Sequence, residues 1–344
     1  MAERMKAAVW YGIGDIRIEE VEKPAPNQDE VLVKVGACGI CGTDLHMLKG
    51  EYTYAVPPII LGHEFSGLVT EVGSNVKMIK VGDRVAVNPN KNCGECIYCR
   101  RGRPHLCLNM KPYGITQNGG FAEYCKVHSS VAIKLLKEVS YEEGSYMEPV
   151  SCAYHCIETA SILPGQSVAV FGPGPVGLIL VQLARASGGK PIINIGTRNE
   201  RLKKAKLLGA DTVINSTKED AIKRILDETD GVGVDIAMEA VGKGSVIKQA
   251  LDCVCKGGKA IIFGACSESD VVQISPYVLL NREISIISAF LNPYTLEKAV
   301  RAIQTGIVRV RELTSHTLPL KKISQGFEIM DRKPRGYMKV IVKP

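Results

Sequence analysis

The stretch Phe171-Gly172-Pro173-Gly174-Pro175-Val176-Gly177, which reads FGPGPVG, decides the fold of this chain. It continues the apolar run Ser167–Phe171, and the residues Val176–Ser187 after it have helical spacing. Glycines between a strand and a helix let the backbone approach a pyrophosphate, which the helix N-terminus favours electrostatically. A glycine-rich turn without a ligand is the alternative, and the flanking strand and helix argue against it. The residues expected to contact a dinucleotide are Gly172, Gly174, Pro175, Val176 and Gly177.

The same alternation of strand and helix patterns continues along the chain from residue 151 to residue 285. Apolar β runs at Pro191–Ile195, Asp211–Ile214, Val234–Glu239 and Lys259–Phe263 are separated by helical segments such as Asn199–Leu208. This alternation predicts an α/β fold with a doubly wound parallel sheet of the Rossmann type. Further cofactor contacts are expected at Val241, Phe263 and Gly264.

The end of the second predicted strand indicates which dinucleotide is bound. An acidic residue there would hydrogen-bond the ribose 2′-hydroxyl of NAD, but the chain reads Ile195-Gly196-Thr197-Arg198-Asn199. Gly196 leaves room for a 2′-phosphate, and Thr197 and Arg198 can donate hydrogen bonds to it, whereas a carboxylate would repel it. The sequence therefore favours NADP(H) over NAD(H). An ordinary cation at the start of a helix is the alternative interpretation of Arg198.

Residues 1–150 have a different pattern, with short β-branched runs such as 31–35, 67–72 and 83–87 between glycines and prolines. This pattern predicts a mainly-β domain. A long loop-like stretch at 88–120 needs a cross-link to hold it. Beyond residue 285 the helical stretch Thr295–Gln304 and short β runs predict that residues 286–344 return to the first domain.

Four cysteines in the spacing C-x2-C-x2-C-x7-C could supply that cross-link as a structural zinc site in a lobe at residues 88–110. Four thiolates this close in sequence can close a tetrahedral site, and a redox pair is the alternative. Loss of one cysteine should therefore reduce stability before it affects chemistry. The four ligands are Cys93, Cys96, Cys99 and Cys107.

Cys41, in GICGTDLH, and His63, in LGHEF, form a second candidate metal site. One cysteine and one distant histidine can hold a zinc ion that keeps an open position, which is the arrangement of catalytic sites. Alone, the pair is weak evidence, since a lone histidine is more often part of a core or a surface.

Composition excludes several other classes of protein. The chain has 344 residues, of which 45% are hydrophobic and 23% charged, so two ordinary globular domains are expected. The net charge of +7 is dispersed and aromatic residues are only 6%, so nucleic acid is not an expected partner. The N-terminus lacks the apolar run of a secretory signal and no stretch approaches the ~20 apolar residues of a membrane span. Twelve cysteines are many for a cytosolic protein, but without a secretory signal a reducing cytoplasm is the expected location.

GICGTDLH at 39–46, GHE at 62–64, the four-cysteine segment and FGPGPVG occur in one order with consistent spacing. Together they resemble the zinc-dependent medium-chain dehydrogenase/reductase superfamily, and within it the sorbitol (polyol) and threonine dehydrogenase branch. The resemblance covers essentially the whole chain. It implies a mainly-β GroES-like catalytic domain beside the Rossmann domain, with one catalytic and one structural zinc ion per chain.

The resemblance also assigns roles at the catalytic zinc. Cys41 and His63 match its ligands, and Glu64 matches an adjacent acid that is a direct or exchanging ligand. Glu148, in MEPVSC, matches the third protein ligand or a carboxylate bonded to the zinc water. Which glutamate binds directly stays open.

The resemblance further places Thr43 on the substrate oxygen and makes His46 the outer histidine of a proton relay, so that the catalytic set is Thr43, His46, Glu64 and Glu148. Asp44 is expected to be a structural support. The candidate pocket walls Tyr52, Phe121 and Leu291 are equally well explained as core residues.

The expected activity is the reversible, NADP-preferring oxidation of a secondary alcohol, such as a sugar alcohol, to a ketone. Sorbitol dehydrogenases carry an arginine in the segment that resembles 288–292, and this chain has none there. Threonine dehydrogenases tend to carry tryptophans soon after the GTD motif, whereas the only tryptophan here is Trp10. An NAD-dependent threonine or small-diol dehydrogenase is one alternative, and a catalytically silent NADPH-binding protein is another. By analogy, a homotetramer or homodimer is expected.

Overall fold

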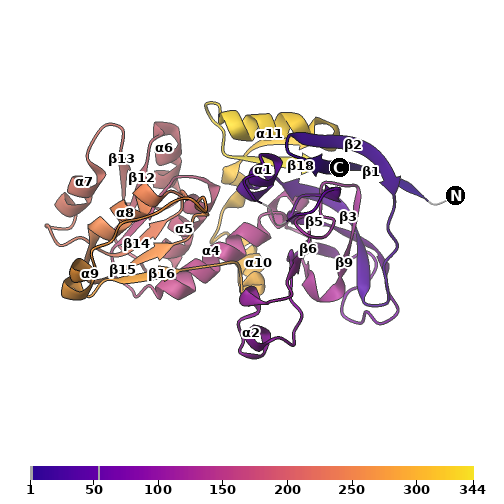
Figure 1. Ribbon diagram of the computed structural model, residues 1–344, viewed down its shortest axis with the longest axis horizontal. Coiled ribbons are helices and arrows are strands. Elements are labelled where there is room, and N and C mark those ends of the chain that lie inside the picture. Colours follow the sequence, from indigo (N-terminus) through magenta and orange to yellow (C-terminus); the bar gives the residue numbers. More distant parts are fainter. Residues whose placement is uncertain (1–2, 53–54) are drawn as a thin grey trace. The chain divides into compact units, whose positions relative to one another are not determined.

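The computed structural model describes residues 3–52 and 55–344, which divide into two compact units (Figure 1). Unit 1 comprises Met1–Ser151, Pro293–Gly306 and Val310–Pro344, and unit 2 comprises Cys152–Asn292 and Ile307–Arg309. None of the helices in the described ranges is long and apolar enough to cross a membrane.

Unit 2 contains a six-stranded sheet in which every neighbouring pair of strands is parallel. The strands lie in the order β13 (Thr212–Asn215), β12 (Ile192–Gly196), β11 (Val168–Phe171), β14 (Val234–Glu239), β15 (Val254–Ile262) and β16 (Ser285–Ser288). In sequence terms this order is 3-2-1-4-5-6, that of the doubly wound dinucleotide-binding fold. The predicted fold class is confirmed for this unit.

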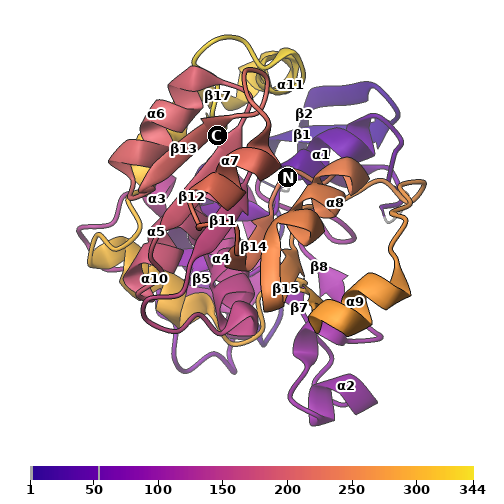
Figure 2. The ribbon, with the colours of Figure 1, turned by 90° about the vertical axis from the view of Figure 1, so that its left-hand side faces the viewer.

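Helices accompany these strands, as Figure 2 shows. Helix α5 packs on β11 and β12, α6 on β12 and β13, and α8 on β14 and β15. The side chains of β11 are all buried, because a central parallel strand is covered on both faces. The helices of the unit are α5 (Pro175–Ala186), α6 (Asn199–Leu207), α7 (Ala221–Asp227), α8 (Gly244–Cys253), α9 (Pro276–Arg282) and the end of α4 (Met147–Ala160).

The boundary expected after residue 285 lies too early in the chain. Strand β16 pairs with β15 in the register Lys259↔Ser285 to Ile262↔Ser288 and forms the sixth strand of the sheet. The structural division falls after Asn292 instead. The short run Ser285–Ser288 carries no local feature that assigns it to one sheet or another, since strand pairing is a long-range property.

Unit 1 is mainly β, with a three-stranded sheet in the order β2-β1-β4 and a larger sheet in the order β10-β6-β5-β3-β18-β17, to which β9 adds by pairing with β3. Side chains of these strands fill one apolar core. The strands are β1 (Arg4–Gly12), β2 (Asp15–Glu22), β3 (Glu30–Gly39), β4 (Ile59–Ile60), β5 (Glu64–Val72), β6 (Arg84–Val87), β7 (Asn90–Lys91), β8 (Lys111–Pro112), β9 (Tyr124–His128), β10 (Ala132–Lys134), β17 (Thr314–Pro319) and β18 (Lys339–Lys343). The helices are α1 (Gly42–Leu48), α2 (Ile97–Arg100), α3 (Tyr141–Gly144), the start of α4, α10 (Leu296–Gln304) and α11 (Ile323–Arg332).

Three segments that are far apart in sequence meet at one end of the larger sheet. The last residue of β3, Gly39, pairs with Glu64 in β5 and with Ile341 in β18. A Cβ on Gly39 would lie 2.4 Å from Glu64 Oε2 and 3.0 Å from Lys339 Cε. Only glycine therefore allows these two charged side chains to lie against the end of β3.

Candidate functional site

Helix α1 presents the first predicted metal ligand at its N-terminal end. Cys41 is the N-cap residue of this helix, and its backbone N–H donates to Asp44 Oδ2 at 2.8 Å. Asp44 is fully buried and completes a capping box with Cys41. A capping box satisfies the unpaired N–H groups of a helix start, so the sequence CGTD fixes where the Cys41 sulfur lies.

The ring of His63 lies beside the other oxygen of the same aspartate. Asp44 Oδ1 lies 3.4 Å from His63 Nδ1 and accepts from the Gly62 N–H at 3.4 Å. A carboxylate beside one ring nitrogen orients the ring and leaves the other nitrogen for a metal. Burial opposes protonation of His63, but Asp44 and Cys41 outweigh it and raise the pKa of the imidazole well above its usual value. The surroundings of His63 are therefore anionic and suit a cation.

Glu64 is buried beside a lysine that the sequence analysis missed. Glu64 Oε2 forms an ion pair with Lys339 Nζ of β18, and the side chains are 2% and 8% exposed. Burial opposes the charge on Lys339, but Glu64 and Cys41 outweigh it and raise the pKa of its ammonium group. One sequence feature could have indicated this residue. A lysine inside the apolar run Met338–Val342 must find a partner if the strand is buried.

The three residues Cys41, His63 and Glu64 form a group whose ligand atoms all lie within 4.8 Å of one another. A thiolate, an imidazole and a carboxylate are all zinc ligands, and three protein ligands leave a fourth position for water or substrate. Within the described part of the chain, Glu148 is not a member of this group. It lies in the first turn of α4 with 9% of its surface exposed. The geometry thus favours Glu64 over Glu148 as the third ligand.

The two predicted relay residues lie on α1. Thr43 Oγ1 is 3.8 Å from Cys41 Sγ, so its hydroxyl lies next to the candidate metal group. The His46 side chain is 39% exposed, and its Nδ1 bonds to Glu51 Oε2. Tyr52, a candidate pocket wall, lies against the His46 ring with centroids 4.9 Å apart. His46 therefore sits at the protein surface with a carboxylate beside it, where a proton could pass to solvent.

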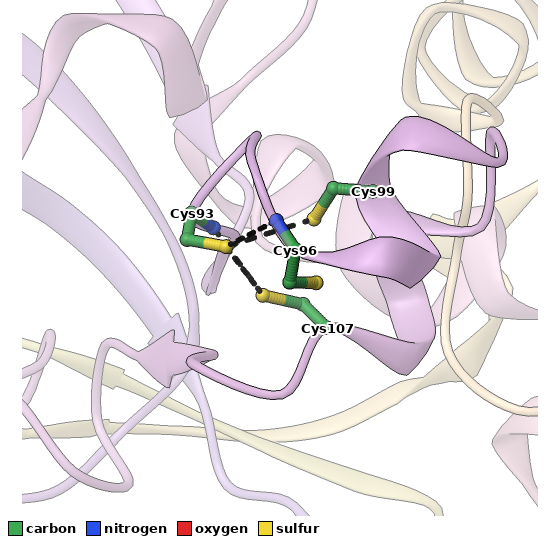
Figure 3. A group of neighbouring side chains, drawn as sticks. All are labelled: Cys93, Cys96, Cys99 and Cys107. Carbon is green, nitrogen blue, oxygen red and sulfur yellow. Dashed lines mark hydrogen bonds between the residues drawn. The ribbon is translucent and has the colours of Figure 1, made fainter.

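The four cysteines of the predicted structural site come together in the loop around α2 (Figure 3). Their sulfur atoms lie within 4.8 Å of one another, with Cys93 Sγ 3.5 Å from Cys107 Sγ and 4.0 Å from Cys99 Sγ. Tetrahedral zinc with bonds of about 2.3 Å would place its sulfur ligands about 3.8 Å apart. The observed spacing fits this requirement.

Backbone groups of the loop already favour thiolate in this cluster. The N–H groups of Cys99 and Leu108 point at the Cys96 sulfur and lower the pKa of that thiol to about 6. Burial and the neighbouring Cys96 act the other way on Cys99 and raise its pKa to about 12. Four thiols this close cannot all ionise unless a cation compensates their charge, and a divalent metal supplies that charge.

The glycine-rich loop after β11 has the geometry expected of a phosphate site. Gly172 has φ of 105°, and a Cβ on Gly177 would lie 1.8 Å from Gly172 O. Gly174 is the N-cap of α5 and Pro175 occupies its first turn, as is usual at helix starts. A Cβ on Gly174 would meet nothing within 4 Å. The start of α5 is thus open to a pyrophosphate, which the N–H groups of Val176 and its neighbours would favour.

The end of β12 differs in one respect from the expectation. A Cβ on Gly196 would lie 2.4 Å from Pro173 Cδ. The space beside Gly196 is therefore filled by the proline ring of the glycine loop, and the interpretation that this glycine leaves room for a 2′-phosphate was wrong. Thr197 is exposed, and Arg198, which is half-buried, is the N-cap of α6.

The remaining predicted cofactor residues follow the carboxyl ends of β14 and β15. Val241 Cγ2 would lie 2.8 Å from a Cβ on Gly172, so its side chain lies against the glycine loop. Phe263 and Gly264 both donate backbone N–H groups to Glu239 O, at 3.1 and 2.9 Å. Glu239 itself was missed by the sequence analysis. It is a fully buried acid at the end of a β run, which is an unusual place for a charge.

Phe121, another candidate pocket wall, belongs to the core of unit 1. It is fully buried and meets Phe327 edge to face at 6.2 Å. Leu291 lies in unit 2 with φ of 57°.

Comparisons with known proteins find relatives over both parts of the chain. The model of the alcohol dehydrogenase GroES-like domain matches residues 27–137, and the model of the zinc-binding dehydrogenase family matches residues 175–305. A sorbitol dehydrogenase of Bacillus subtilis is 36% identical over 99% of this chain and 98% of its own length. An L-threonine 3-dehydrogenase of Pyrococcus abyssi is 40% identical over 100% of this chain and 99% of its own. A solved structure described as a zinc-binding dehydrogenase of Sinorhizobium meliloti bound to NADP aligns with a TM-score of 0.95 at 34% identity, covering 99% of this chain and 100% of that one.

Proposed function

The chain belongs to the zinc-binding alcohol dehydrogenase family and is an oxidoreductase acting on CH–OH groups, and we propose that it oxidises a secondary alcohol to a ketone with NADP as the preferred acceptor. The observation that carries this proposal is the Cys41–His63–Glu64 group, whose ligand atoms lie within 4.8 Å of one another. A zinc ion in this group would act as a Lewis acid and lower the pKa of a hydroxyl that it holds. The dinucleotide would carry the hydride.

The residues of unit 1 would orient the alcohol and move its proton. Thr43, beside Cys41 Sγ, would accept the hydroxyl proton of the substrate through its own hydroxyl. His46 would deliver that proton to solvent, because its ring is exposed and bonded to Glu51. Glu148, in the first turn of α4, would hold the water at the open position until the substrate replaces it.

The preference for NADP rests on Thr197 and Arg198 at the end of β12. An acid at this point would mark an NAD enzyme, and the chain has none between Gly196 and Asn199. The similar structure from Sinorhizobium meliloti was solved with NADP.

The substrate class we propose is a linear polyol or a related secondary alcohol, in line with the sorbitol dehydrogenase relative. The absence of an arginine from residues 288–292 argues against a sorbitol-type polar grip. A second candidate, threonine or a small diol, is favoured by the 40% identity to a threonine 3-dehydrogenase.

We also propose a structural zinc at Cys93, Cys96, Cys99 and Cys107. A homotetramer or homodimer is the proposed assembly, and a reducing cytoplasm, which suits twelve free thiols, is the proposed location.

The test is to follow absorbance at 340 nm with NADP and with NAD against pentitols, hexitols, short diols, simple secondary alcohols and threonine, with and without a zinc chelator. We expect chelator-sensitive reduction of NADP by one alcohol class. Turnover of threonine alone would favour the second candidate. A zinc-loaded protein that binds NADPH and turns over nothing would be a catalytically silent binding protein instead.

The cofactor preference has its own test in Arg198→Ala, with Lys203→Ala as the matched control. Lys203 lies on the same helix and is exposed, so both changes remove one positive charge from α6. We expect only the change at Arg198 to raise KM for NADP while KM for NAD stays the same. Equal effects of the two variants would remove Arg198 from the proposal.

A further inference from the structure

Glu239, the last residue of β14, is a buried acid for which the proposed chemistry has no role. Its side chain is fully buried. Its Oε1 accepts the backbone N–H groups of Val241 at 2.7 Å and Gly242 at 2.8 Å. Its Oε2 has no hydrogen-bond partner among the described residues. Burial raises the pKa of Glu239, although these N–H groups act in the opposite direction.

Glu239 links the two turns that follow β14 and β15, through its carboxylate to the first turn and through its backbone oxygen to the second. Gly264, in the second turn, donates its N–H to the backbone oxygen of Glu239 at 2.9 Å. A Cβ on Gly264 would lie 2.3 Å from Gly242 N and 2.7 Å from Glu239 Oε2. The turns therefore pack directly on each other and on the carboxylate, and a side chain at position 264 would push them apart.

The first of these turns lies against the glycine loop. Ala240 donates its N–H to Phe171 O at 3.0 Å, which ties the turn to the end of β11. A Cβ on Gly172 would lie 2.8 Å from Val241 Cγ2 and 3.1 Å from Ala240 O. A displacement of Val241 would thus alter the wall beside the loop where the pyrophosphate is expected.

Leaving a carboxylate in an apolar interior is unfavourable unless hydrogen bonds compensate for lost hydration. Here Oε1 of Glu239 accepts two charge-assisted hydrogen bonds, which are stronger than neutral ones. Oε2 accepts none from the described residues. The carboxylate of Glu239 therefore stabilises the fold mainly through its hydrogen bonds to the backbone of Val241 and Gly242.

We propose that Glu239 is a positioning residue for the dinucleotide, because its Oε1 fixes the 240–242 turn against the glycine loop. This inference rests on the proposed nicotinamide cofactor. Glu239 does not touch the reacting atoms and acts through Val241 and Gly242. Its loss should therefore weaken cofactor binding more than it affects the metal groups of unit 1.

The test compares Glu239→Gln with Asp235→Asn in the full-length, zinc-loaded protein. Asp235 lies at the other end of the same strand, and its Oδ2 also accepts a backbone N–H, from Ser167 at 2.8 Å. Both variants remove one charge and keep an acceptor oxygen. The readouts are the Kd for NADPH by fluorescence titration, the melting temperature, the zinc content, and kcat and KM.

We expect E239Q to raise the Kd for NADPH about tenfold, equivalent to about 1.4 kcal/mol, with unchanged zinc content. D235N should lower the melting temperature and leave the Kd within twofold. If E239Q binds NADPH as tightly as the unaltered protein, or if D235N weakens binding equally, the positioning role is wrong. If the unaltered protein binds neither NADPH nor NADH, the proposed function fails as well. Should E239Q not fold, Glu239→Asp, which retracts the carboxylate by one methylene, takes its place with the same expectation.

Discussion

Replacing Lys339 by methionine should make the stability of unit 1 depend strongly on metal at the Cys41 site. Methionine keeps an unbranched apolar side chain of similar length and removes the ammonium group that pairs with Glu64. Removing one member of a buried ion pair costs about 3–5 kcal/mol, because the other charge is left unpaired. In the metal-free protein we expect the free energy of unfolding to fall by about this amount.

A zinc ion at the site should reduce this loss of stability, because it supplies positive charge to the carboxylate of Glu64. If zinc restores about half of the loss, the metal-bound variant should be destabilised by only about 2 kcal/mol relative to the unaltered protein. The variant is therefore destabilised less in the zinc-bound state than in the metal-free state, and by linkage this difference must appear as tighter zinc binding. Since about 1.4 kcal/mol corresponds to a factor of ten, K339M should bind zinc at this site more tightly by roughly 10- to 50-fold.

The assay is denaturant unfolding of protein with and without the labile zinc, together with a zinc titration against a competing chelator. Metal analysis should verify that the four-cysteine site stays loaded in both samples. Lys343→Met is the control, because Lys343 lies on the same strand and its pair with Glu142, at 2.7 Å, is 49% exposed on the lysine side. An exposed pair contributes less than about 1 kcal/mol. Equal destabilisation of K339M in the metal-free and zinc-loaded states would refute the reasoning.

Three further predictions concern other parts of the molecule. Cys96→Ser should remove one zinc per chain by metal analysis and lower the melting temperature, while the fraction that stays folded keeps its kcat. Asp44→Asn should weaken zinc binding at the Cys41 site about 10- to 100-fold, because Asp44 orients His63; competition titration would measure this, and unchanged affinity would contradict it. Although burial acts against it, Arg185 and the Ile192 N–H lower the pKa of Asp211, so Asp211 stabilises the fold above an unfolded-state pKa of about 3.9. Asp211→Asn should therefore be less stable than the unaltered protein at pH 6 by urea unfolding, and this gap should close as the pH falls below about 3.9 towards the folded-state pKa.

The architecture of unit 2 was predictable because its signals are local. The predicted strand Val234–Glu239 coincides with β14, and the predicted helix Val176–Ser187 differs by one residue at each end from α5. Glycine spacing at 172–177 located the centre of the sheet, since only glycine tolerates the backbone approach between Gly172 and Gly177. Periodicity and steric limits of this kind can be recognised without knowing the partner strands.

The features that escaped prediction depend on contacts between distant segments. Strand β16 could not be assigned, because only its pairing with β15 places it in the sheet. Lys339 lies 275 residues after Glu64, and no local pattern joins the two. The packing of Pro173 against Gly196 likewise joins separate loops, which is why the glycine was explained by a ligand rather than by its neighbour.

Both candidate metal sites carry negative charge that needs a nearby cation, but the source of that cation differs between them. At the Cys41 site the carboxylate of Glu64 is almost fully buried, and burying it without a cation would strongly oppose folding. Lys339 provides that cation from the protein itself, so we expect the side chains of this site to be in place before a metal binds. The four cysteines instead lie half-buried in a loop, where N–H groups of the backbone favour thiolate at Cys93 and Cys96. Such a cluster keeps its sulfur atoms together best when a metal neutralises their charge. We therefore expect removal of zinc from the four cysteines to unfold the lobe. Removal of zinc from the Cys41 site should instead abolish activity.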